Sequence, residues 1–70
     1  MQPRRPYRVE RDKWERGFWK CWFTLSTEEL AKLRAAAWQE FYNERGMIGR
    51  FRVVNKDTGT VLWDGADWDG

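Results

Sequence analysis

The chain has 70 residues, enough for one domain but close to the lower limit for a chain that buries a core without metals or disulfides. It contains one cysteine and no histidine, which excludes an intramolecular disulfide, a Cys/His zinc site and histidine-based acid–base catalysis. No apolar run approaches the length of a membrane span. We therefore expect a cytoplasmic, intracellular protein that is not an enzyme and holds no metal or cofactor, with no membrane partner.

The formal net charge is only +2, but the charge is unevenly distributed. Residues 1–20 carry seven Lys or Arg against three acids, whereas residues 21–45 and 46–70 each carry three against four. Residues 1–6 are expected to form a flexible basic arm in which Arg4 and Arg5 are candidate contacts for phosphates or for an acidic protein surface. The alternative is a solvated tail without a partner.

Two short strands are predicted before the long helix of the chain. Residues 7–12 alternate in polarity, which fits an edge strand blunted by charge. Residues 16–25 are aromatic and end too close to a helix start to form another long helix, so a strand is predicted. One face of that strand would be wholly apolar and pack on the core, and it carries Trp19, Cys21, Phe23 and Leu25. The other face would point outward and carries Phe18, Lys20, Trp22 and Thr24. Cys21 is accordingly predicted to be buried and unreactive.

The segment from Ser26 to Gly46 has the pattern of one long helix. Ser26 is placed to cap the first turn, Glu29 would complete a capping box, and Gly46 suits a left-handed C-terminal position. At about 100° per residue one apolar stripe is the predicted core face, with Trp38 and Tyr42 beside it, and consists of Leu30, Leu33, Ala37 and Phe41. Arg34 is interpreted either as a snorkelling side chain at the helix edge or as half of a partner-facing pair with Trp38.

Residues 48–64 have the clearest hairpin pattern in the chain. A three-residue loop over 57–59 with a left-handed Gly59 is predicted, and its register pairs Val53 with Trp63 and Arg52 with Asp64. The inward side chains would then be Phe51, Val53, Val61 and Trp63, and the outward ones Arg50, Arg52, Val54, Leu62 and Asp64. A loop longer by one residue would turn Trp63 to the outer face.

Together these elements predict one α+β domain over residues 7–64, with a ββαββ-like order and one helix packed on a three- or four-stranded, mainly antiparallel sheet. Residues 65–70 would form an acidic tail whose Trp68 either covers the sheet edge or is presented to a partner. Many small accessory proteins share this order of elements, including phage-encoded proteins that bind a host protein. This likeness is an analogy of architecture and does not identify a family.

Six Trp, four Phe and two Tyr are more than so small an interior can cover, so some aromatic side chains are expected at a binding surface. The predicted surface is the sheet face away from the helix, with Trp22 as anchor and Phe18, Lys20, Arg50 and Arg52 around it, unless the arm or tail covers that face. Secondary candidates are Arg34, Trp38, Trp68, Arg4 and Arg5. We expect a non-catalytic protein that docks on a larger protein and modulates it, with inhibition as the first expectation. The alternatives are a single-stranded nucleic-acid or RNA-binding module and a self-assembling subunit such as a homodimer.

Overall fold

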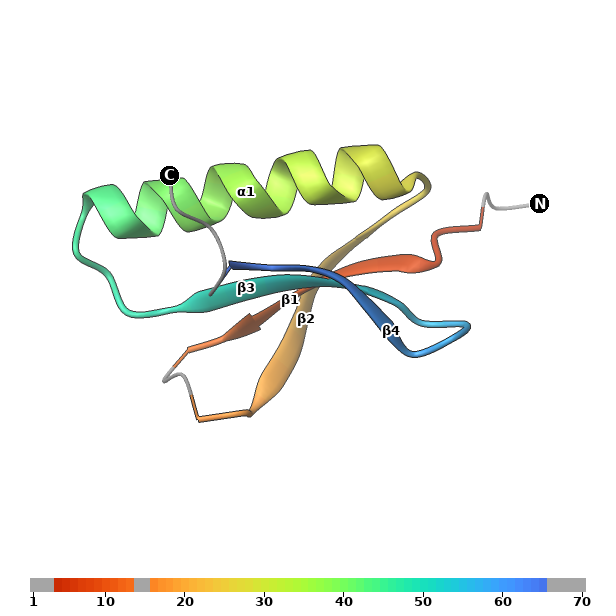
Figure 1. Ribbon diagram of the computed structural model, residues 1–70, viewed down its shortest axis with the longest axis horizontal. Coiled ribbons are helices and arrows are strands. Elements are labelled where there is room, and N and C mark those ends of the chain that lie inside the picture. The colour runs from red at the N-terminus through yellow and green to blue at the C-terminus, as the bar shows by residue number, and fades with distance from the viewer. Residues whose placement is uncertain (1–3, 14–15, 66–70) are drawn as a thin grey trace.

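The computed structural model of the chain describes residues 4–13 and 16–65 (Figure 1). Its elements in chain order are strands β1 (Tyr7–Asp12) and β2 (Trp19–Leu25), helix α1 (Glu28–Glu44), and strands β3 (Arg50–Asn55) and β4 (Thr60–Asp64). The strands form one antiparallel sheet in the order β2-β1-β3-β4, and α1 lies along one face of it. The predicted α+β fold, with one helix on a mainly antiparallel sheet, is confirmed.

Strand β1 lies in the middle of the sheet, so the edge position predicted from its charges is wrong. It pairs with β2 on one side and with β3 on the other. Its charged residues face partners across the sheet: Glu10 lies opposite Arg52, whose Nε donates to Oε1 of Glu10 at 2.8 Å. An alternating pattern of charge therefore reflects cross-strand ion pairing here, and not protection of a free edge.

Helix α1 turns a different face to the sheet from the one that its apolar pattern predicts. The helical residues that it buries are Ala31, Ala35, Gln39 and Tyr42. Leu33 remains 67% exposed, and Leu30 and Phe41 remain 36% and 37% exposed. Two residues turn a helix by roughly 200°, so Leu33 lies almost opposite Ala35. The prediction that Leu30, Leu33, Ala37 and Phe41 form the core face is wrong.

Large aromatic side chains on the sheet explain why α1 packs through its small residues. The rings of Trp22 and Phe51 already fill the space above the strands, with their centroids 5.1 Å apart. Small Ala31 and Ala35 let the helix backbone approach these rings closely, and both alanines are fully buried. Large aliphatic side chains at the same positions would overfill the interior, so the leucines remain on the outer side.

The two ends of α1 agree only partly with the predicted caps. Thr27 is the N-cap, because its Oγ1 accepts a hydrogen bond from the N–H of Leu30 at 3.3 Å. The start therefore lies one residue later than predicted from Ser26, and Glu29 is not at the position that a capping box needs. At the other end Gly46 has φ of 63°, so the prediction of a left-handed glycine there is confirmed.

A β-bulge in β2 changes which of its side chains face the helix. Val9 pairs with Phe23, but the next residue, Glu10, pairs with Cys21, so Trp22 is an extra residue in β2. The side chains of this strand that pack against the core are Trp22, Phe23 and Leu25. Cys21 is turned to the opposite face and is exposed. The inward positions of Phe23 and Leu25 are confirmed, whereas the outward Trp22 and the buried Cys21 were wrong predictions.

The loop of the β3–β4 hairpin is longer than predicted. Asn55 pairs with Thr60, so the turn covers residues 56–59 and not the predicted 57–59. The N–H of Gly59 donates to the carbonyl oxygen of Asn55 at 2.7 Å, and Gly59 has the predicted left-handed backbone, with φ of 75°. A loop longer by one residue should turn every following side chain to the other face.

A second bulge, in β4, cancels that change. Val54 pairs with Val61, but Val53 pairs with Trp63, so Leu62 is an extra residue. Leu62 packs against the core and Val61 is exposed, which exchanges the orientations predicted for these two residues. The pairs beyond the bulge are the predicted ones, Val53 with Trp63 and Arg52 with Asp64.

Hydrogen bonds from the Gln39 side chain connect the helix to the start of β3. Its side chain is buried; Nε2 donates to the carbonyl oxygen of Gly49 at 3.1 Å, and Oε1 accepts the N–H of Phe51 at 2.9 Å. The ring of Tyr42 lies over Gly49, where an added Cβ would be 2.8 Å from the ring carbons. These contacts set the rotation of α1 about its own axis, and hence which helical residues remain at the surface.

Candidate functional site

The predicted anchor of the binding surface, Trp22, lies on the helix side of the sheet. Its ring meets Trp38 edge-on, with centroids 5.0 Å apart and planes at 81°, and meets Phe51 in the same way. Arg50 and Arg52 lie on the opposite face, which α1 does not cover. The prediction of a surface that joins Trp22 to these two arginines is therefore wrong in its geometry.

The other two members of the predicted surface are also separated. Phe18 is 73% exposed in the segment just before β2. Lys20 is exposed and pairs across the strands with Arg11, whose guanidinium donates to the hydroxyl of Tyr42 at 2.8 Å. Because paired residues point to the same face, Lys20 belongs to the helix side. The five predicted residues do not form one continuous surface.

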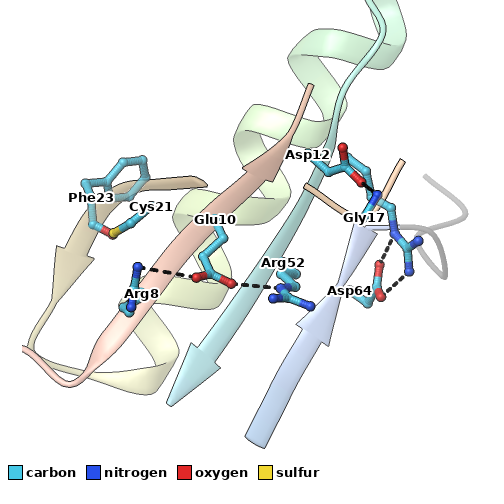
Figure 2. A network of polar contacts seen from close by, with 9 residues as sticks. Arg8, Glu10, Asp12, Gly17, Cys21, Phe23, Arg52 and Asp64 are labelled. Carbon is cyan, nitrogen blue, oxygen red and sulfur yellow. Dashed lines mark hydrogen bonds and ion pairs between the residues drawn. The ribbon is translucent and has the colours of Figure 1, made fainter. Parts of the chain in front are cut away.

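The sheet face away from α1 carries a network of ion pairs (Figure 2). Glu10 accepts from Nε of Arg52 at 2.8 Å and lies 3.5 Å from a terminal nitrogen of Arg8. Arg50 binds both carboxylate oxygens of Asp64, with its Nε 2.7 Å from Oδ1. Each of these arginines has a carboxylate partner within the sheet. The face is therefore largely neutralised, which weakens any attraction for an external phosphate or acidic surface.

Trp19 also belongs to this outer face, so its predicted place in the core is wrong. The guanidinium carbon of Arg52 lies 4.0 Å from the centre of the Trp19 ring, and that of Arg50 lies 5.5 Å from it. The bulge at Trp22 is the reason, since it reverses the orientation of every β2 residue that precedes it. The Trp19 ring is therefore partly covered by arginines that the chain itself supplies.

An apolar surface lies on the other side of the molecule, along α1 and the neighbouring strand β2. It contains two adjoining hollows. The first is lined by Arg34, Ala37, Trp38 and Phe41. The second lies where the helix meets β2 and is lined by Trp22, Phe23, Leu25, Arg34 and Trp38. We name these lining residues, together with the adjacent exposed Leu30 and Leu33, the α1–β2 surface.

Small and large side chains alternate along α1 in a way that explains the first hollow. Ala37 lies one turn after Leu33 and one turn before Phe41, so its short side chain leaves a depression between two large ones. Trp38 forms the wall between the two hollows, held by edge-on contacts to Trp22 at 5.0 Å and to Phe41 at 5.6 Å. A hollow with a fixed aromatic wall is suited to an apolar side chain of another molecule.

The charges beside the α1–β2 surface differ from those of the outer sheet face. Arg34 lines both hollows, Arg11 lies 4.7 Å from the Trp22 ring centre, and Arg45 lies 3.9 Å from that of Phe41. Within residues 4–13 and 16–65, none of these three arginines forms an ion pair. The surface thus combines apolar rings with cations that have no carboxylate partner there.

The remaining candidate residues lie at the ends of the chain. Arg4 forms an ion pair with Asp57 in the β3–β4 loop, and Arg5 is exposed. Residues 1–3 of the predicted arm and Trp68 of the predicted tail lie outside the described residues. Whether the arm or the tail covers a face of the sheet therefore stays a prediction.

Carboxylate and thiol side chains are spread over residues 4–13 and 16–65. Nowhere among them do three or more His, Cys, Asp or Glu side chains gather in a way that could hold a metal ion. Helix α1 is neither long enough nor apolar enough to cross a membrane.

Three surface residues were not predicted as such from the sequence: Leu30, Leu33 and Phe41. They were assigned to the core because their apolar stripe resembles a core face. The signal that could have exposed the error is the second stripe of Ala31, Ala35 and Tyr42, which also has helical spacing. Two apolar stripes on one helix cannot both face a single sheet. One of them has to remain available to another molecule or to water.

Comparison with known proteins adds no relative to these observations. No protein-family model, no curated protein and no solved structure matches the chain. The candidate site is therefore defined by its own geometry, its exposed apolar side chains and its unpaired cations.

Proposed function

We propose that this protein is a small, non-catalytic docking module that binds a larger protein through the α1–β2 surface and so modulates it, with inhibition as the first effect to test. The observation that carries the proposal is the orientation of α1. The helix packs on the sheet through alanines and leaves Leu33, one of its two leucines, 67% exposed. An exposed apolar stripe gains nothing from folding, and such surfaces are typical of contact sites between proteins.

The residue types on the surface support the same proposal. Binding hot spots are enriched in tryptophan and arginine and tend to lie beside pockets that exclude water. Trp38 and Arg34 line both hollows, and Phe41 closes one of them. The proposal also includes action inside the cell, which the lone exposed thiol of Cys21 supports. It further includes a phage-type role against a host protein, which only the architecture supports.

The test is site-specific photocrosslinking in cell extract, followed by affinity measurement with the captured protein. A photoreactive amino acid at position 33 should crosslink a larger protein, whereas the same group at position 61 should not. Val61 is a matched control, because it is an exposed aliphatic residue on β4. The captured partner is then purified, and its affinity for each variant is measured. Leu33→Ala should lower this affinity by about tenfold or more, and Val61→Ala by less than about twofold. Equal effects of the two substitutions would reject the α1–β2 surface as the docking site.

Nucleic-acid binding is the second candidate, and the unpaired Arg11, Arg34 and Arg45 beside aromatic rings favour it. Base stacking, however, needs free ring faces. Here Arg11 covers the Trp22 ring and Arg45 covers that of Phe41. If nucleic acid is the partner, nuclease treatment of the extract should abolish capture, and affinity should fall steeply with salt as counterions are released.

A homodimer would cover the same apolar stripe without any other partner. Sedimentation of the purified protein over a wide concentration range distinguishes this case. A dimer that Leu33→Ala dissociates would replace the docking proposal with self-association, because it would occupy the residues on which docking depends. A monomer at all concentrations leaves the stripe free for a different protein.

A further inference from the structure

We propose that the α1–β2 surface recognises an acidic amphipathic segment of its partner, in which a carboxylate binds Arg34 while apolar side chains on either side of it enter the two hollows. This inference rests on the proposed docking function and adds the chemistry of the segment that docks. It comes from how the hollows and the cations are placed relative to one another.

Arg34 lies between the two hollows. Both hollows are lined by Arg34 and by Trp38, so a segment that fills both must pass over these two residues. The rest of the lining is apolar, from Ala37 and Phe41 on one side and from β2 on the other. A segment that fits therefore carries an apolar side chain, then a group that meets a guanidinium, then a second apolar side chain.

Covering the Arg34 guanidinium with a partner costs free energy unless the partner supplies an anion. Arg34 is exposed and forms no ion pair within the part of the chain that the structure describes. A partner that removes water from this charge without supplying an anion would leave a desolvated, unpaired cation, which is strongly unfavourable. A carboxylate opposite Arg34 satisfies the charge, and arginine and carboxylate can form two parallel hydrogen bonds.

The lining of the hollows favours a peptide over a nucleic acid as the source of the anion. The hollows are lined mainly by carbon, while the guanidinium of Arg45 sits 3.9 Å over the Phe41 ring and hinders base stacking there. A polypeptide with alternating apolar and acidic residues matches both features. A phosphate backbone matches only the charge.

The experiment is a selection from a random 12-residue peptide library, displayed against the immobilised protein and, in parallel, against its Arg34→Glu variant. The enriched peptides are then synthesised and titrated by fluorescence polarisation. Lys56→Glu is the control, because it makes the same change of charge at an exposed residue in the β3–β4 loop. Circular dichroism and a thermal melt establish that all three proteins are folded.

The wild-type protein is expected to enrich peptides with Asp or Glu between apolar residues. Arg34→Glu should weaken these peptides by about tenfold or more and should itself enrich Lys or Arg at the same place, whereas Lys56→Glu should change affinity by less than about twofold. The proposal is overturned by enrichment of peptides without acids, by equal effects of the two charge reversals, or by tighter binding of an oligothymidylate that displaces the peptides.

The outcomes also separate this inference from the docking proposal. If Leu33→Ala abolishes binding of the captured partner and Arg34→Glu does not, the acidic segment is wrong and the docking surface stands. If neither substitution affects the captured partner, both proposals fail.

Discussion

Replacing Gln39 by leucine tests how the helix is attached to the sheet. Gln39 is the one polar residue among the buried positions of α1, and it bonds both the carbonyl oxygen of Gly49 at 3.1 Å and the N–H of Phe51 at 2.9 Å. Leucine has a similar volume, so the substitution removes these hydrogen bonds without opening a large cavity. What remains is a carbonyl and an N–H at the start of β3 that are buried without this partner.

The expected magnitude follows from those two backbone groups. An unsatisfied buried polar group costs about 1–3 kcal/mol, and the more apolar leucine side chain offsets part of the sum for two groups. We expect Gln39→Leu to lower the free energy of unfolding by about 2–4 kcal/mol. In a domain of this size that corresponds to a drop of roughly 10–30 °C in Tm. The loss is a large part of the stability that a small domain has.

Urea and thermal unfolding, followed by tryptophan fluorescence and far-UV circular dichroism, measure this loss. Asn43→Ala is the control, because Asn43 is exposed and shares only one hydrogen bond with Gln39, at 3.2 Å. Its cost should be below about 1 kcal/mol. If Gln39→Leu stays within about 0.5 kcal/mol of the wild type, water satisfies the two groups of β3, and ring packing alone holds the helix in place.

Three further predictions follow from burial and close contacts. Phe51→Ala should cost about 3–5 kcal/mol of unfolding free energy and Leu33→Ala less than about 1 kcal/mol. The opposite order in urea titrations would mean that the stripe containing Leu33 is the core face after all. Gly49→Ala should cost about 1–3 kcal/mol, because its Cβ would lie 2.8 Å from the Tyr42 ring; an unchanged Tm would mean that the ring moves aside easily. The thiol of Cys21 should react with a thiol reagent in the native protein nearly as fast as after unfolding, whereas a need for denaturant would contradict its exposure.

The register of the β3–β4 hairpin was predictable, although its loop length and its regularity were not. The predicted pairs Val53 with Trp63 and Arg52 with Asp64 are present. They arise from a loop longer by one residue and a bulge at Leu62, two deviations that cancel. Side-chain alternation alone favours this result, because it places Phe51, Val53 and Trp63 on the core face. The positions of the two deviations have no clear sequence signal, and so the orientations of Val61 and Leu62 were exchanged.

The orientation of β2 could not be read from alternation for a related reason. Aromatic residues occupy both faces of this strand, since Trp19 and Trp22 would point in opposite directions in a regular strand and Phe23 follows directly. A bulge places Trp22 and Phe23 on the same side, and nothing in the local sequence opposes it. Packing decides the question: Trp22 fills the space beside Phe51, while Trp19 lies beneath Arg52 on the outer face.

Helix α1 carries two apolar stripes, and only one of them faces the sheet. Periodicity identifies an apolar stripe but does not say what covers it, and the stripe of Leu33 and Phe41 is the more hydrophobic of the two on this helix. The sheet selects the other stripe, because its rings leave room only for Ala31 and Ala35. A stripe that local sequence marks as a core face and that folding leaves exposed is a conflict between two levels of structure. Such conflicts are expected where a chain is shaped for function as well as for stability, and here the conflict coincides with the hollows around Arg34 and Trp38.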